Sequence, residues 1–221
     1  MAEEVRPVFK PMTTPKGKVA YAWLTSPDTK FYAEGVYHCQ LWLSAGQPEV
    51  DAFIGELEAC TQKVFEYEKA KRTPIQERKK ALSIDSPFSE GCDADGNETG
   101  ELVIKAKQKA AIEYKDKKTG EKKKLDNLRP MFFDAQGKAI EKPPAIYPGS
   151  IVRLRVQPVP YMRAVDATCG VSLRLVAVQI VELAPSTFKG ATAEECGFES
   201  EEGYIQESID TASFPQSADD F

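Results

Sequence analysis

Apolar and polar residues alternate with a period of two along several stretches of the chain, as they do in β-strands that bury one face. This alternation predicts strands over residues 19–27, 35–43, 101–114, 151–162 and 171–183. Turn-rich segments separate these stretches, so we expect them to be joined by hairpins of uneven length. Many strands with few helices predict an all-β-dominated fold, in the form of a small closed β-barrel of five or more strands.

One stretch, residues 48–72, instead repeats its apolar residues at the three-to-four-residue spacing of a helix with one buried face. The repeating positions are Val50, Phe53, Ile54, Leu57, Cys60, Val64 and Phe65. Pro48 suits a first helical turn, and acidic residues near the start and basic residues near the end match the helix dipole. The sequence therefore predicts one main α-helix that packs on the sheet.

The alternation stops near Lys189, and the composition changes at the same point. Residues 190–221 contain nine acidic residues and no Lys or Arg. The whole chain has a net charge of -5, so residues 1–189 carry +4. The pattern predicts an N-terminal arm (1–16), a folded domain (17–189) and a disordered acidic tail (190–221). A basic body with an acidic tail is typical of a protein that binds a polyanion with which its tail competes.

The signatures of several protein classes are missing from the sequence. No apolar run approaches the roughly 20 residues that span a bilayer, and the acidic N-terminus has no apolar block, so we expect a cytoplasmic protein that does not enter a membrane. The five cysteines are dispersed, which indicates reduced thiols without zinc-ligand spacing. His38 is the only histidine, and the Asp-rich segment 93–98 has Glu98 in place of the invariant glycine of a calcium loop. We therefore predict a protein that is not an enzyme and needs no metal or cofactor.

Two of the predicted strands each carry, on one face, a row of basic side chains about 7 Å apart, which is close to the phosphate spacing of an extended single strand. Aromatic residues lie near both rows, and single-stranded nucleic acid binds where phosphates meet cations and bases stack on rings. Such rows also form ordinary solvated faces, and each aromatic residue could instead pack in a core. The lysine-rich segment 115–124 is either a further phosphate clamp or a solvated hairpin tip. The candidate DNA-binding residues are Tyr21, Trp23, Lys105, Lys107, Lys109, Arg153, Arg155, Tyr161 and Arg163.

The order of these motifs along the chain resembles that of one known family. The matching stretches are "AYAWLTSPD" (20–28), "GVYHCQLWL" (35–43), the helix with the acidic start, "IKAKQKAAIEYKDKKTGEKKKLDNL" (104–128), "IVRLRVQPVPYMRAVDATCGVSL" (151–173), "VQIVELA" (178–184) and the terminal "DDF". They are similar to those of the single-stranded-DNA-binding proteins that phages of the T-odd coliphage type use in replication. The resemblance implies an OB-fold barrel that coats single-stranded DNA without sequence preference and promotes annealing of complementary strands.

The resemblance also implies roles for individual residues. The matching basic and aromatic DNA-binding positions are Lys107, Lys109, Arg153, Arg155 and Tyr161. Glu34 stands where the family has a basic residue, so that contact is expected to be lost or to be supplied by Lys30. The segment 73–82 is charged differently from the family, which leaves the path of the DNA there open.

The end of the acidic tail offers a protein-binding element. Asp219 and Asp220 precede the terminal Phe221, whose ring could anchor in a partner with a basic rim. The resemblance implies that these residues contact the replication DNA polymerase and the helicase-primase, in the cytoplasm of an infected bacterial host. The sequence is also compatible with a homodimer. The alternative function is a protein-interaction module whose basic faces serve only solubility.

Overall fold

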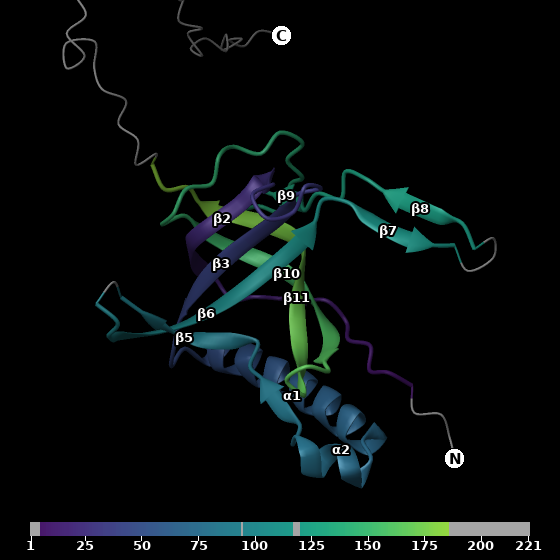
Figure 1. Ribbon diagram of the computed structural model, residues 1–221. Helices are drawn as coiled ribbons and strands as arrows, with labels where there is room; N and C mark the ends of the chain where they lie inside the picture. The colour runs from purple at the N-terminus through teal and green to yellow at the C-terminus, as the bar shows by residue number, and fades with distance from the viewer. Residues whose placement is uncertain (1–4, 94, 117–119, 186–221) are drawn as a thin grey trace, which may run out of the picture. The chain divides into compact units, whose positions relative to one another are not determined.

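The computed structural model describes residues 5–93, 95–116 and 120–185 of the 221-residue chain (Figure 1). The helices are α1 (Pro48–Lys71) and α2 (Pro74–Lys79). The strands are β1 (Met12–Thr13), β2 (Gly17–Asp28), β3 (Val36–Ser44), β4 (Ser83–Asp85), β5 (Phe88–Cys92), β6 (Glu98–Lys109), β7 (Ile112–Lys115), β8 (Lys122–Leu125), β9 (Met131–Phe133), β10 (Ile151–Arg163) and β11 (Thr168–Glu182). The predicted disordered tail, with Asp219, Asp220 and Phe221, lies outside the described residues.

Five long strands pair around a ring, which confirms the prediction of an all-β-dominated fold with one main helix. The strand order is β10-β2-β3-β6-β11, and β11 pairs in turn with β10. The β2–β3, β3–β6 and β10–β11 pairs are long and antiparallel, whereas β10–β2 and β6–β11 pair over only two residues each. A five-stranded ring of this kind, partly open at its short pairs, is the architecture of the OB-fold.

The apolar residues of the alternating strands fill the interior of the ring. Val152, Leu154 and Val156 of β10 are completely buried, as are Leu41 and Leu43 of β3. The apolar face of α1 packs into the same core, and α1 contacts β10 and β11. Full burial of one Val or Leu side chain stabilises a fold by about 1.5–3 kcal/mol. The intervening residues of these strands must therefore point outward, where a ligand can reach them.

The expected N-terminal arm comprises residues 1–16, and its described part runs alongside β10. Its strand β1 pairs antiparallel with β10. Next to β1, the Thr14 backbone N–H donates to the carbonyl of Leu154 at 2.9 Å. Nearer the N-terminus, the Arg6 guanidinium donates to the carbonyl of Pro160 at 2.5 Å. These contacts attach the arm to the outer edge of the β10–β11 pair.

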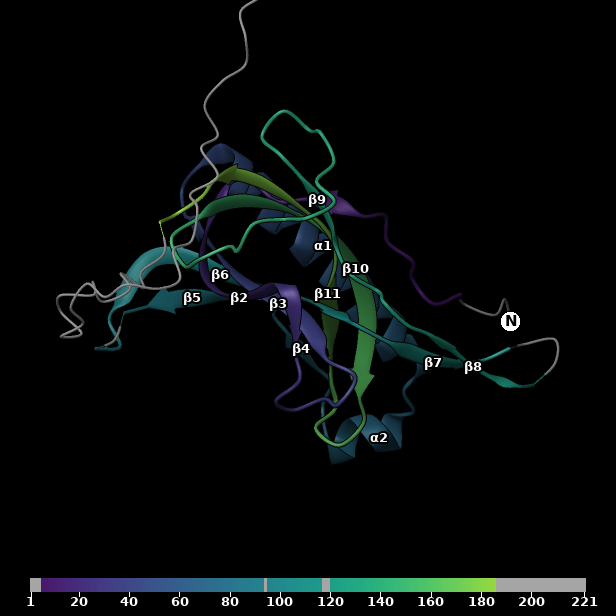
Figure 2. The same ribbon diagram turned by 90° about the horizontal axis from the view of Figure 1, so that it is seen from above.

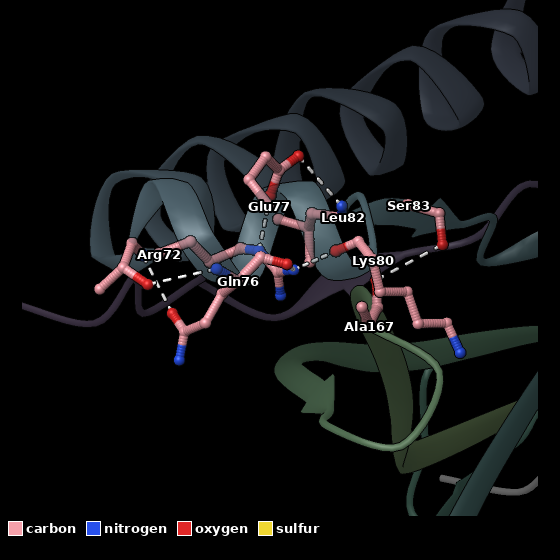
Figure 3. A network of polar contacts seen from close by, with 8 residues as sticks. Arg72, Gln76, Glu77, Lys80, Leu82, Ser83 and Ala167 are labelled. Atoms are coloured by element: carbon pink, nitrogen blue, oxygen red, sulfur yellow. Dashed lines mark hydrogen bonds and ion pairs between the residues drawn. The ribbon is translucent and has the colours of Figure 1, made fainter.

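The charged segment between α1 and β6, which the sequence predicts as turn-rich, forms α2, β4 and β5. Figure 3 shows the polar network that holds α2 in place. The Arg72 guanidinium donates to the Glu77 carboxylate at 2.7 Å, and Glu77 also accepts from the Leu82 backbone N–H at 3.2 Å. The hydrogen bond from Arg72 is the main reason that the pKa of Glu77 is lowered. The Ser83 N–H then donates to the Ala167 carbonyl at 2.9 Å, and β4 runs on parallel to β11.

The strand predicted over 101–114 is interrupted. β6 ends at Lys109, and β7 begins at Ile112. Between them the Ala110 N–H donates to the carbonyl of Gly35 at 3.0 Å, which ties the break to the loop between β2 and β3. The chain then leaves the ring, and Figure 1 shows the β7–β8 hairpin projecting away from it.

Candidate nucleic-acid interface

A groove of about 630 Å³ lies over the strands of the ring. Residues of β2, β3, β4, β6, β10 and β11 line it. Figure 2 shows β10 and β11 side by side, extending past the ring toward α2, so their far ends form one wall of the groove. The predicted DNA-binding residues that line the groove are Tyr21, Lys105, Lys107, Tyr161 and Arg163. The fold thus brings together five of the nine candidates from three separate strands.

The pairing register explains why side chains of β2, β3 and β6 meet in the groove. Trp23 of β2 lies opposite His38 of β3, and His38 lies opposite Lys107 of β6. The next row on the same face consists of Tyr21, Gln40 and Lys105. Directly opposite residues of antiparallel strands have Cβ atoms roughly 4.5–5.5 Å apart. Each row therefore runs from an aromatic ring through a polar side chain to a lysine.

The rings of β2 contact each other and His38. Trp23 Nε1 donates to the Tyr21 hydroxyl oxygen at 3.2 Å, and the Tyr21 and His38 rings stack with their centroids 5.3 Å apart. His38 Nε2 also lies 3.3 Å from a carboxylate oxygen of Asp28. Hydrogen bonds from the Lys30 backbone N–H and then from His38 lower the pKa of Asp28. Tyr21 and Trp23 remain exposed, so bases can stack on them, since every base has an aromatic face.

Tyr161 and Arg163 of β10 and Asp85 of β4 also line the groove. The Tyr161 hydroxyl donates to the Asp85 carboxylate, which the Arg163 guanidinium also contacts at 3.1 Å. The central carbon of that guanidinium lies 5.8 Å from the Tyr161 ring centroid. Burial, followed by the hydrogen bond to Asp85, raises the pKa of Tyr161, so its hydroxyl stays protonated. Arg163 also contacts the Asp166 carboxylate at 3.2 Å, so two carboxylates, those of Asp85 and Asp166, hold the Arg163 guanidinium.

The remaining predicted cations lie outside the groove. Lys109 lines a separate cavity beside Lys124. Arg153 contacts Glu49 of α1 at 3.8 Å, and Arg155 donates a hydrogen bond to β1. At the rise per residue of a strand, Arg155 lies about 20 Å along β10 from Tyr161, which lines the groove. Arg153 and Arg155 of β10 therefore face α1 and the N-terminal arm, whereas Lys105 and Lys107 of β6 face the groove.

Among the groove residues that were not selected from the sequence, His38 and Asp85 make the contacts described above. His38 is recognisable there only as an outward residue of its strand, and its place between Trp23 and Lys107 depends on the register of three strands. Asp85 lies within the segment 71–100, which is expected to be rich in turns, and nothing in the sequence relates it to Tyr161. The charged side chains of the groove are thus Lys105, Lys107 and Arg163 against the carboxylate of Asp85.

Other kinds of site are not found in the described part of the chain. It contains no group of three or more His, Cys, Asp or Glu residues that could hold a metal ion. None of its helices has the length and apolar character needed to cross a membrane. Its cysteines, Cys39, Cys60, Cys92 and Cys169, are free thiols, as expected from their dispersion. The groove itself offers open rings beside regularly spaced cations, which suits a flexible polymer of flat rings and negative charges.

Known proteins are similar to this chain in sequence and in fold. The family model described as "Single-stranded DNA-binding protein, Bacteriophage T7" matches residues 16–183. The single-stranded DNA-binding protein of Enterobacteria phage T3 is 34% identical over 197 residues, which cover 83% of this chain and 79% of that protein.

Solved structures agree. The crystal structure of gp2.5, a single-stranded DNA-binding protein encoded by bacteriophage T7, matches with a TM-score of 0.61 and 27% identity, over 90% of this chain and all of that one (100%). The single-stranded DNA-binding protein from bacteriophage Enc34, solved in complex with ssDNA, shares the fold at 15% identity, with a TM-score of 0.53 over 83% of this chain and 95% of that one. The extent of the family match and the identity to the phage T3 protein show that this chain belongs to the family of phage single-stranded DNA-binding proteins represented by that of bacteriophage T7.

Proposed function

We propose that this protein binds single-stranded DNA without sequence preference during phage replication, coating and protecting it in the cytoplasm of the infected bacterial host. The observation that carries the proposal is the groove, which is lined by two rings and three cations from separate strands: Tyr21 of β2, Lys105 and Lys107 of β6, and Tyr161 and Arg163 of β10. The family is defined by DNA binding and not by a catalytic reaction, which confirms the prediction that the protein is not an enzyme.

The groove chemistry favours a single strand over a duplex. Lysine and arginine side chains contact phosphates, which are the same at every position and carry no sequence information. The rings of Tyr21, Trp23 and Tyr161 can stack only on bases that are not already stacked and paired in a helix. A protein-interaction module, the alternative function, would need neither open rings in a groove nor a row of cations at the spacing of phosphates.

The direct test is titration of labelled oligo(dT) by fluorescence anisotropy at several salt concentrations. Neutralising one phosphate of a single strand contributes about -0.7 to the slope of log K against log salt. With three groove cations engaged, we expect a slope of about -2 and much weaker binding of a duplex of the same length. A salt-independent affinity, or equal affinities for the two DNA forms, would contradict the proposal.

The proposal extends to annealing and to the acidic tail. Coating a strand without reading its sequence keeps bases unpaired and unfolded, which helps complementary strands to find each other. The tail, with nine acidic residues after Lys189, competes with DNA phosphates for the basic groove. Once DNA has displaced it, Asp219, Asp220 and Phe221 bind the replication DNA polymerase or the helicase-primase, with the Phe221 ring as the apolar anchor.

A further inference from the structure

Five aromatic side chains of the described residues are exposed. They are Tyr21, Trp23, Phe31, Tyr32 and Tyr114. Tyr21 lines the groove, and Trp23 lies in the row with His38 and Lys107. Phe31 and Tyr32, which are 78% and 59% exposed, lie in the loop between β2 and β3 (residues 29–35). Tyr114 lies on β7 of the hairpin. Because burial of rings is strongly favourable, exposed rings on the loop and the hairpin suggest a surface for a ligand.

A second cavity, of about 320 Å³, lies where this loop meets the base of the hairpin. Tyr32 and Gly35 line it from the loop, and Lys109, Ile112 and Lys124 line it from β6 and the hairpin. Gly35 adopts φ of +80°, a conformation that suits glycine, and its carbonyl accepts the hydrogen bond that interrupts the strand after β6. The turn at Gly35 therefore brings Tyr32 of the loop beside Lys109 of β6 and Lys124 of the hairpin.

The lysine row of β6 connects the groove to this cavity. Lys105 and Lys107 line the groove, and Lys109 lines the second cavity. The three side chains alternate along one strand, so they point to one face about 7 Å apart. Within the described chain, the Lys109 ammonium has no ion-pair partner. A strand whose phosphates follow the first two lysines reaches the third at the next phosphate step.

One wall of the cavity is held by an ion pair. The Lys124 ammonium lies 2.7 Å from a carboxylate oxygen of Glu34 and 3.2 Å from one of Asp126. The hydrogen bond to Glu34, followed by that to Asp126, raises the pKa of Lys124. Glu34 thus ties the loop to β8 and keeps the lysine occupied. Among the described residues that line the cavity, Lys109 is the lysine without an ion-pair partner. Lys109 is therefore available to contact a phosphate, and the Tyr32 ring is available to stack on a base.

We propose that the space between the β2–β3 loop and the β7–β8 hairpin is a second nucleotide subsite. A strand that leaves the groove along β6 places a phosphate on Lys109 and stacks a base on the Tyr32 ring. The inference rests on the proposed function, since the ligand of both sites is the same single strand. It adds that the bound length of DNA is set partly by the loop and the hairpin, outside the ring.

The test is a length series of oligo(dT), from about 4 to 16 nucleotides, the range of site sizes of OB-folds. The wild-type affinity should rise with length in two stages, as first the groove and then the subsite is filled. Tyr32→Ala should bind the short oligonucleotides like the wild type and lose roughly 5- to 150-fold in affinity for the long ones, because one stacked base is lost. Lys109→Ala should lower the magnitude of the salt slope by about 0.7 for long oligonucleotides only.

Tyr67→Ala is the matched control, because Tyr67 lies on α1 and lines neither cavity. It should follow the wild type at every length. Equal length dependence in wild type, Tyr32→Ala and Lys109→Ala would overturn the subsite while leaving groove binding intact. A loss of affinity by Tyr32→Ala that is the same at all lengths would also overturn it. Failure of the wild type to bind any oligonucleotide would instead reject the proposed function.

Discussion

The hydroxyl group of Tyr161 donates a hydrogen bond to the carboxylate of Asp85, the same carboxylate that Arg163 contacts at 3.1 Å. The Asp85 carboxylate thus holds the guanidinium of Arg163 and the hydroxyl of Tyr161, two groove residues that DNA would contact. A phosphate that approaches Arg163 has to compete with Asp85.

Asp85→Asn should therefore tighten the binding of single-stranded DNA. The gain should reach up to about fivefold at low salt, since a partly exposed ion pair is worth about 0.2–1 kcal/mol. It should shrink as salt screens the charges. Glu141→Gln makes the same charge change in the loop between β9 and β10, outside the groove, and should show little gain. Weaker binding by Asp85→Asn would mean that Asp85 serves mainly to position Tyr161.

The ring of Tyr161 should contribute to DNA affinity through stacking. Tyr161→Ala should cost about 1–3 kcal/mol of affinity for oligo(dT), with the salt slope nearly unchanged because no phosphate contact is removed. Tyr161→Phe keeps the ring and loses only the hydrogen bond to Asp85, so it should bind nearly like the wild type. Anisotropy titrations of both variants, with melting curves to check the fold, separate the ring from the hydroxyl. Normal binding by a folded Tyr161→Ala protein would make the ring purely structural.

The basic residues of β6 and β10 should differ in their salt dependence. Lys107→Ala should reduce the magnitude of the salt slope by about 0.7, because Lys107 lines the groove. Arg153→Ala should leave the slope almost unchanged, because Arg153 faces Glu49 of α1 in another cavity. The slopes come from the same anisotropy titrations at four or more salt concentrations. If Arg153→Ala changes the slope as much as Lys107→Ala does, the DNA also follows the start of β10.

Gly170 should be required for the close approach of β4 to β11. A Cβ atom at Gly170 would lie 2.6 Å from the Asp85 backbone oxygen and 3.3 Å from the Tyr161 hydroxyl. Gly170→Ala should therefore lower the free energy of unfolding by about 1–3 kcal/mol, as overpacking does. Gly55→Ala is the control, because Gly55 lies in α1 and its added Cβ would meet no other residue within 4 Å. This variant should raise the free energy of unfolding by about 0.5–1 kcal/mol. Denaturant titration measures the free energy of unfolding of both variants. Equal values for the Gly170 variant and the wild type would show that β4 can shift to make room for the added methyl group at little cost.

The acidic tail should weaken DNA binding when it is present. Removing residues 190–221 changes the net charge of the chain from -5 to +4. The truncated protein should bind oligo(dT) more tightly at low salt, because a tethered competitor at a local concentration on the order of millimolar is gone. Deleting Phe221 alone should leave DNA affinity unchanged and weaken capture of the replication polymerase in a pull-down. Unchanged DNA binding after truncation would reject the competitor, and normal capture without Phe221 would reject the anchor.

The elements of the fold follow closely from local patterns in the sequence. The period of two over 151–162 and 171–183 predicts β10 and β11, and the helical spacing over 48–72 predicts α1 to within one residue. These patterns are reliable because burial selects one face of an element, and the face repeats with the geometry of the backbone. The short helix α2 was missed, although Thr73, Pro74 and Gln76 form the start of a capped helix, because its six residues bury no apolar face.

Alternation also identified which side chains point outward, but it did not decide which of them share a surface. Lys105 and Lys107 meet Tyr21 because β3 pairs with both β6 and β2 in one register. Arg153 has the same outward direction on β10, yet α1 places Glu49 beside it. Sequence patterns report the direction of each side chain relative to its own strand. Neighbours across the groove depend instead on hydrogen-bonded pairing and packing between segments far apart in the chain, and those are set only when the whole ring folds.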